Sequence, residues 1–189
     1  PRELKSLSTT SAFYDPRIGR QISLLSEGEK MVYLTLSWRE DVAEIREQFP
    51  LAIRETLSIA EHYCIKHPMA GGKYIVMTSD FLVDFIDGKQ TVFSVKASEE
   101  DITDPRTAEK LFIEKNYWEN KGVDFTMVYK NIHVNEVYAT NIRAVMAYYD
   151  INEVNSIEDL VMHLIAHKKI ITDMTVNDLP IRQWAENLK

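Results

Sequence analysis

The sequence predicts an α/β fold in which a mixed sheet is flanked by helices. Runs with strand-like alternation and runs with helical spacing follow one another along the chain. The clearest local pattern is a hairpin, with strand-like runs at 74–77 and 81–83, a turn at Asp87–Gly88 and a returning strand at 91–95. The expected order is helix, strand, helix, hairpin, helix, strand, helix, which indicates one layered α/β structure.

The elements before the hairpin are predicted from a cap and a proline. Residues 26–29 have the Ser-x-x-Glu form of a capping box. The apolar residues at 31–38 fit either a strand or a helix, and we favour a helix with Glu29 in its first turns. Residues 42–49 form an extended segment that the following proline stops. Residues 51–63 are expected to form a second helix.

The elements after the hairpin lead into a change of composition. We expect a helix at 106–121, a short strand at 125–129 and a helix at 137–149. From residue 150 on, the pattern changes to short helices. About forty residues cannot build much of an independent core. The prediction is therefore a main domain at 1–149 and a short helical C-terminal region at 150–189 that packs on it.

The composition is that of an ordinary globular protein. Of 189 residues, 45% are hydrophobic and 27% are charged. The apolar runs are too short to span a bilayer, and the N-terminus lacks the apolar region of a secretory signal. The single cysteine, Cys64, cannot form an internal disulfide, and we expect a buried thiol there. These features predict a cytoplasmic protein, encoded by a bacterium or a phage, without a membrane partner.

The strongest chemical pattern lies at the two ends of the predicted hairpin. Asp80 interrupts two apolar strand halves, and Ser94-Val95-Lys96 ends the returning strand. Residues 94 and 96 share one face of that strand because side chains alternate. A carboxylate opposite a lysine, with a second acid from a helix, is the arrangement that metal-dependent phosphodiesterases use. A cross-strand ion pair gives the same bare pattern, so the spacing alone is a weak signal.

The chemistry of such a site follows from the preferences of Mg²⁺. This ion takes hard oxygen ligands and keeps several waters, and a pair of ions clamps the attacking and departing oxygens of an in-line displacement. The Val95 carbonyl could complete the ligand shell. Lys96 would orient or deprotonate the attacking water and offset charge on phosphorus.

Two other patterns are weaker. His163 and His167 stand at helical i, i+4 spacing, but no glutamate follows the first histidine and no third ligand is near. Surface or capping histidines are therefore favoured over a zinc site. The acidic residues at 99–104 are interpreted as a solvated loop.

Several runs of residues resemble the signature of the TnsA endonucleases of Tn7-like heteromeric transposases. These runs are Leu24-Leu25-Ser26-Glu27-Gly28-Glu29, Asp41 with Ile45 to Leu51, Ile65 to Pro68, Thr78 to Asp84, Val95-Lys96, and Arg106-Thr107 with Glu109-Lys110, Glu114 and Tyr117-Trp118. They recur in order over residues 14–145, about three quarters of the chain.

The resemblance implies a restriction-endonuclease-like fold of the PD-(D/E)XK type and a set of site residues. It implies Glu29 as the helix acid, Asp80 as the strand acid, and Ser94-Val95-Lys96 as the element that is normally Glu/Gln-x-Lys. The catalytic set is then Glu29, Asp80, Ser94 and Lys96. Glu29, Asp80 and the Val95 carbonyl would hold Mg²⁺, for which Mn²⁺ could substitute. The serine departs from the family pattern, and a lost ligand role with retained activity is expected there.

The resemblance also implies partners. TnsA proteins cut the 5′ strands at transposon ends, beside a TnsB-type DDE transposase that cuts the 3′ strands and under an AAA+ regulator, TnsC. A net charge of −7 fits such an arrangement, because phosphate neutralisation supplies most non-specific DNA affinity. An acidic nuclease should therefore depend on a partner for delivery to duplex DNA.

Contacts with DNA and two alternative functions stay open at the level of sequence. The first twenty residues carry four basic and two acidic side chains, and a solvated tail is favoured over a DNA-facing arm. Arg17, Arg20, Lys66 and His67 are the candidate DNA contacts. The alternative functions are a catalytically silent docking module that recruits the AAA+ regulator and a stand-alone phage or repair nuclease.

Overall fold

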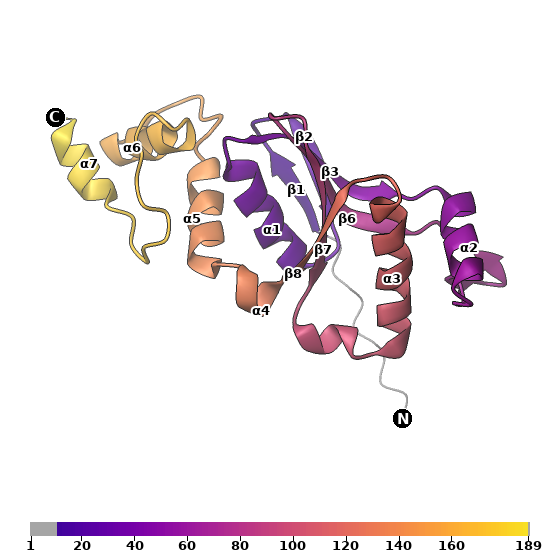
Figure 1. The fold of residues 1–189 in the computed structure, drawn as a ribbon. Helices are drawn as coiled ribbons and strands as arrows, with labels where there is room; N and C mark the ends of the chain where they lie inside the picture. The colour runs from indigo at the N-terminus through magenta and orange to yellow at the C-terminus, as the bar shows by residue number, and fades with distance from the viewer. Residues whose placement is uncertain (1–10, 189) are drawn as a thin grey trace. The chain divides into compact units, whose positions relative to one another are not determined.

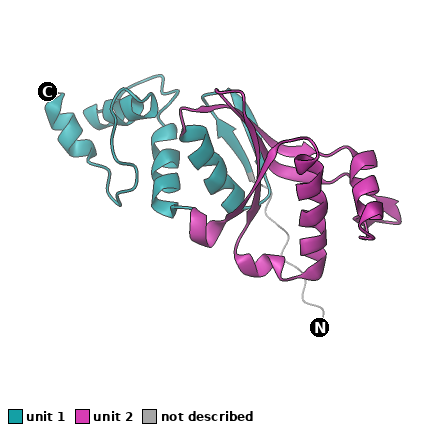
Figure 2. Cartoon of the chain, viewed as in Figure 1, with its two compact units in different colours: residues 1–38, 134–189 teal, residues 39–133 magenta. Residues whose placement is uncertain are grey.

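The computed structural model describes residues 11–188, so the first ten residues of the expected solvated tail lie outside the described range (Figure 1). The chain divides into two compact units, residues 1–38 with 134–189 and residues 39–133 (Figure 2). The predicted boundary at 149/150 thus falls inside unit 1, which joins the N-terminal segment to the C-terminal region.

Unit 2 is built, within its described residues, on a four-stranded mixed sheet of order β3-β6-β7-β8. The strands are β3 (Val42–Pro50), β6 (Thr78–Phe85), β7 (Gln90–Lys96) and β8 (Asp124–Tyr129). The first three are antiparallel neighbours, whereas β8 runs parallel to β7. The mixed α/β sheet that the sequence predicted is therefore confirmed (Figure 1).

Helices connect the strands and supply part of the core of unit 2. They are α2 (Ile53–His62), the 3₁₀ turn η1 (Glu99–Ile102), α3 (Pro105–Glu119) and α4 (Lys130–His133). A parallel pair needs a long crossover, and η1 with α3 forms the one between β7 and β8. Ile113 and Trp118 of α3 pack with Leu82 and Val92 of the sheet. One face of α3 is thus held against the strands that carry the site.

The segment before β6 differs from the prediction. Residues 75–77, expected as a strand, are irregular, and a small hairpin of β4 (Met69–Ala70) and β5 (Lys73–Tyr74) precedes them. Gly71 and Gly72 turn this hairpin with φ angles of 55° and 76°, a left-handed conformation that favours glycine. The apolar residues at 74–76 are thus exposed residues of the hairpin and its exit, whereas Met77 is buried in the core of unit 2.

Unit 1 begins with a hairpin where a solvated tail was favoured. Its strands are β1 (Ser11–Asp15) and β2 (Arg20–Leu24), and Ile22 and Leu24 of β2 are fully buried. The described part of the N-terminal segment is therefore an ordered part of the unit, and the expectation of a tail is wrong there. Helix α1 (Glu27–Trp38) follows, as the capping box predicted.

The C-terminal residues share one core with the N-terminal helix. The helices are α5 (Glu136–Met146), α6 (Ile157–Ala166) and α7 (Ile181–Asn187). Buried Leu34 of α1 packs in one cluster with Ile142 of α5 and Ile165 of α6. Residues 150–188 thus complete the core of unit 1. None of the described helices is long and apolar enough to cross a membrane.

Two side-chain expectations have clear outcomes. The ring nitrogens of His163 and His167 bind the carbonyl oxygens of Tyr148 (2.8 Å) and Tyr149 (3.0 Å), just after the C-terminal end of α5. These contacts give the two histidines the capping role that the sequence favoured. Cys64 is exposed, with a φ of 54° just after α2, and the expectation of a buried thiol is wrong.

Candidate active site

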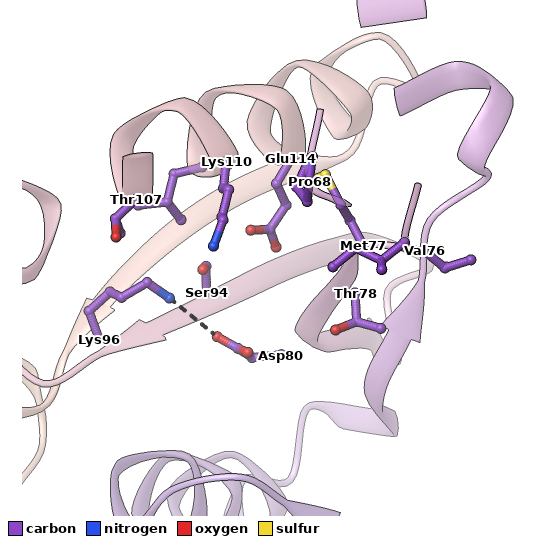
Figure 3. Close-up of a pocket in the computed structure, with 12 residues that line it drawn as sticks. Pro68, Val76, Met77, Thr78, Asp80, Ser94, Lys96, Thr107, Lys110 and Glu114 are labelled. Atoms are coloured by element: carbon purple, nitrogen blue, oxygen red, sulfur yellow. Dashed lines mark ion pairs between the residues drawn. The ribbon is translucent and has the colours of Figure 1, made fainter. Parts of the chain in front are cut away.

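Antiparallel pairing of β6 and β7 brings Asp80 and Lys96 together. Asp80 lies near the start of β6 and Lys96 is the last residue of β7, so both stand at the same end of the hairpin. The Lys96 Nζ is 4.0 Å from the Asp80 Oδ2 (Figure 3). The same carboxylate oxygen accepts a 2.6 Å hydrogen bond from the Val95 backbone N–H. The sequence therefore predicted correctly that these three residues meet.

The Val95 backbone is hydrogen-bonded to both Asp80 and Lys96. Its N–H is bound to Asp80, and its carbonyl oxygen accepts a 2.9 Å hydrogen bond from the Lys96 Nζ. Burial raises the pKa of Asp80, while the positive charge of Lys96 and hydrogen bonds from Val95 and Gln48 act in the opposite direction. The Lys96 ammonium group is thus hydrogen-bonded to the Val95 carbonyl, which the resemblance predicts to be a metal ligand.

A second carboxylate reaches the same pocket from helix α3. Glu114 is buried, with 6% of its surface exposed, and its side chain points toward Ser94 and the strand end (Figure 3). The hydroxyl groups of Ser79 and Ser94 hydrogen-bond with its carboxyl group. Its Oε1 is buried and has no hydrogen-bond partner among the described residues. A buried carboxylate oxygen without a hydrogen-bond partner is expected to bind a ligand or to carry a proton.

The surroundings of Glu114 favour its neutral form. Burial raises its pKa to about 7, and the negative charge of Asp80 acts in the same direction. The two serine hydroxyls and Lys96 lower it, but less than burial raises it. Paired carboxylates with unlike environments are typical of sites that bind cations or transfer protons.

Behind Glu114 lies a buried polar layer that fixes its position. Ser79 and Ser94 are 0% and 1% exposed, and the Trp118 indole N–H donates a 2.8 Å hydrogen bond to the Ser79 hydroxyl. Ser94 was kept in the predicted catalytic set with its ligand role expected to be lost, and the structure places it beneath the Glu114 carboxyl (Figure 3). Ser94 stands where the family pattern has a longer side chain, and it lines the pocket together with Asp80 and Glu114.

Sequence reasoning assigned no role to Glu114, although a signal for it exists. The buried residues of α3 are Ile113, Glu114, Tyr117 and Trp118, which form one stripe along the helix. A carboxylate on the buried stripe of an amphipathic helix costs free energy unless it has partners. This conflict between position and charge indicates a functional residue.

The residues of this pocket fit a hard divalent cation. Asp80 and Glu114 supply carboxylate oxygens and Val95 a carbonyl, and Mg²⁺ sites often use one or two carboxylates with water and substrate phosphate. The orphaned Oε1 of Glu114 is the observation that supports the fit. The pocket, lined also by Thr78, has a volume of about 390 Å³, which falls within the range of ~300–1,000 Å³ typical of ligand sites.

Glu29, the predicted helix acid, belongs to unit 1. It sits in the first turn of α1 with 6% of its surface exposed. Its carboxylate accepts hydrogen bonds from the Leu25 N–H (2.9 Å) and the Ser26 hydroxyl (3.1 Å). The Ser26 hydroxyl in turn caps the Glu29 N–H. Its cap role is thus established, and its catalytic role stays a prediction.

The four candidate DNA contacts fall into two groups. Arg17 forms an ion pair with buried Asp15 (2.5 Å), and His67, 4% exposed, has both ring nitrogens bound, to Thr56 and to the Pro68 carbonyl. The structure gives both side chains a role in holding the fold, and contact of either with DNA stays a prediction. Arg20 and Lys66 are exposed.

Comparison with known proteins gives two matches. Residues 39–130 match the family model described as "TnsA-like endonuclease N terminal". The chain is also 37% identical, over 142 residues, to "Transposon Tn7 transposition protein TnsA" of Escherichia coli. That alignment covers 75% of this chain and 52% of the relative, so the chain spans about half the length of the protein it matches. The pocket of Asp80, Lys96 and Glu114 lies wholly inside the family match, and residues 39–130 belong to the TnsA-like endonuclease N-terminal family.

Proposed function

We propose that the chain is the metal-dependent DNA endonuclease subunit of a Tn7-like transposase, which cuts the 5′ strands at transposon ends. The observation that carries this proposal is the pocket in which Asp80, the Val95 backbone and Lys96 meet a second buried acid, Glu114. Mg²⁺ is the proposed cofactor, and Mn²⁺ should substitute for it. The chain spans about half the length of its relative, so the endonuclease activity of that whole protein is proposed for this chain.

The residues of the pocket have separate tasks in hydrolysis. Asp80, Glu114 and the Val95 carbonyl would hold the metal, from which the reaction obtains a more acidic water and a polarised phosphate. Lys96 then leaves the Val95 carbonyl and orients the attacking water toward phosphorus. As the water oxygen bonds to phosphorus, its proton passes to solvent, and the leaving sugar oxygen takes up a proton from solvent when its bond to phosphorus breaks. The ammonium group offsets charge on the phosphoryl oxygens.

A TnsB-type DDE transposase and a TnsC-type AAA+ regulator are the proposed partners. The net charge of −7 supports this part of the proposal, since an acidic chain repels the phosphate backbone and binds it weakly alone. Cleavage of plain duplex DNA by the chain alone, at the rate seen with the transposase, would instead favour a stand-alone nuclease.

The decisive experiment is 5′-strand cleavage of a transposon-end duplex with the partner transposase present. Asp80→Asn and Lys96→Ala should each lower the cleavage rate by roughly 100-fold or more, as expected when a group that stabilises the transition state is lost. Asp87→Asn and Lys89→Ala make matched changes at the opposite end of β6 and should cleave normally. Normal cleavage by the Asp80 and Lys96 variants would show that the site is wrongly assigned.

Metal binding separates the nuclease from a catalytically silent docking module. We expect Mn²⁺, titrated by calorimetry without DNA, to bind the wild-type chain more tightly than Asp80→Asn or Glu114→Gln. The unpartnered Oε1 of Glu114 favours metal binding. The only feature that suggested a catalytically silent module was the serine at position 94. Wild-type Mn²⁺ binding that neither substitution weakens would remove the proposed site.

A further inference from the structure

The small β4–β5 hairpin differs in charge and exposure from the rest of the chain. Residues 62–79 contain no Asp or Glu, although the chain has 29 acidic residues among 189. The same stretch carries Lys66 and Lys73. An acid-free, lysine-bearing stretch in a chain of net charge −7 is a local exception that suits a polyanion.

The hairpin exposes apolar side chains that the core does not use. Met69 is 43% exposed and Tyr74 53% exposed, and the exit residues Ile75 and Val76 are 43% and 51% exposed. At the tip, a Cβ added to Gly71 or Gly72 would meet nothing within 4 Å, so the tip is slender and surrounded by open space. The result is a narrow ribbon with one lysine and several apolar groups.

Buried His67 anchors this ribbon to the body of unit 2. Its Nε2 is 2.9 Å from the Thr56 hydroxyl on α2, and its Nδ1 is 3.1 Å from the Pro68 carbonyl. The Tyr74 ring packs edge-on against the imidazole with centroids 5.5 Å apart. The Ile75 N–H closes the base of the hairpin on the Pro68 carbonyl at 3.2 Å. Such a base holds the ribbon in a defined direction.

The base of the hairpin is continuous with the candidate active site. Pro68 and residues 75–78 line the same pocket as Asp80 and Lys96, and in Figure 3 Thr78 lies next to Asp80 with Met77 beyond it. A duplex whose phosphate lies at Asp80 must therefore pass close to the hairpin. A two-stranded ribbon fits a DNA groove, and apolar side chains at such positions act as wedges between base steps.

From this geometry we infer that the β4–β5 hairpin enters a groove of the duplex that flanks the cleaved phosphate. Lys73 contacts backbone phosphate, while Met69 and Tyr74 lie against sugars or base edges. The inference rests on the proposed nuclease function, which supplies the DNA substrate. It adds a surface that sets where along the duplex the scissile phosphate comes to rest.

Photo-cross-linking tests this contact in the full chain with its transposon-end duplex. Benzoylphenylalanine replaces Lys73 in the hairpin, Lys110 at the pocket, or Lys89 in the β6–β7 turn, where 77% of the lysine side chain is exposed. We expect cross-links to DNA at 73 and 110 and background at 89. A cross-link at 110 without one at 73 overturns the hairpin contact and leaves the nuclease proposal standing. Failure at both 73 and 110 removes the duplex substrate, and the hairpin contact with it.

Charge and apolar variants test the same contact by cleavage. Lys73→Glu and Met69→Ser should lower the yield of 5′ cleavage by several-fold and shift the position of the cut. Lys89→Glu and Ile86→Ser, matched changes at the other end of β6, should do neither. If the hairpin variants lose complex formation with the transposase but keep normal cross-linking to DNA, the hairpin is a protein-binding surface and the inference is wrong.

Discussion

Glu114 is the residue at which burial and charge oppose each other most directly. Burial and the neighbouring Asp80 raise its pKa to about 7 from an ordinary value of 4.5. Below pH 4.5 the carboxyl group is neutral in both the folded and unfolded chain. Between pH 4.5 and about 7 the unfolded chain ionises first, so the free energy of unfolding falls as the pH rises. This is the opposite of the usual carboxylate in an ion pair.

The stability of Glu114→Gln should therefore diverge from that of the wild type as pH rises. Glutamine mimics the neutral acid, so the variant escapes a cost on the order of 3 kcal/mol, at about 1.4 kcal/mol per pKa unit. Urea unfolding at pH 4 and pH 8 measures this difference. We expect similar stabilities at pH 4 and a more stable variant at pH 8. Parallel pH profiles would contradict the raised pKa.

Ser94 should control the acidity of Glu114. The Ser94 hydroxyl is one of the groups that lower the Glu114 pKa, because it hydrogen-bonds with the carboxyl group. Ser94→Ala is then expected to move that pKa further upward, as measured by carbon-13 NMR of the glutamate carboxyl groups over a pH titration. Thr91→Ala, on the same strand but outside the pocket, serves as the control and should leave the titration unchanged.

At the scale of elements, local signals predicted some parts of the fold and missed others. The capping box at 26–29 and the Asp87–Gly88 turn each act within a few residues, and α1 and the β6–β7 hairpin follow them. In the β1–β2 hairpin, Phe13 packs against a cluster that joins Leu34 of α1 with Ile165 of α6, residues far away in the sequence. Such contacts leave no local pattern.

The candidate site divides in the same way. Asp80 and Lys96 meet through hairpin pairing, which alternation and a turn indicate, and their meeting was predictable from sequence. The approach of Glu114 depends on how α3 crosses the sheet after η1. That crossing is set by the packing of Ile113 and Trp118 on strand residues far away in sequence. Glu114 belongs to the residues that resemble the family signature, but only the packing of α3 shows that its carboxyl group reaches the pocket.

The cap of α3 should support both the stability of unit 2 and the site. The Asp104 carboxylate accepts a 2.8 Å hydrogen bond from the Thr107 N–H, and Pro105 begins the helix. Asp104→Ala should lower the free energy of unfolding by about 1 kcal/mol, measured in urea. Asp104→Asn keeps a capping oxygen and should stay close to the wild type. Equal losses in both variants would mean that charge, rather than the cap, matters there.

At the scale of the whole molecule, the two units have separate apolar cores. One core gathers Leu34, Ile142, Val161 and Ile165 within unit 1, whereas the other gathers Leu82 and Ile113 within unit 2. The chain therefore passes from unit 1 to unit 2 and back, and the C-terminal residues complete a core that the first helix begins. The candidate pocket with Asp80 and Lys96 depends on the core of unit 2.

A cavity-creating substitution in the core of unit 2 should disturb the candidate active site, whereas a matched one in the core of unit 1 should not. Ile165→Ala in unit 1 and Leu82→Ala in unit 2 each remove a buried side chain, 1% and 2% exposed, and each should cost about 2–5 kcal/mol. Hydrogen exchange followed by mass spectrometry locates the loss. Ile165→Ala should speed exchange in α1, α5 and α6 while β6 and β7 keep their protection, because cooperative units open separately. Leu82→Ala should do the reverse and weaken Mn²⁺ binding at the pocket. Equal loss of protection in both units from either substitution would show that the two cores unfold as one.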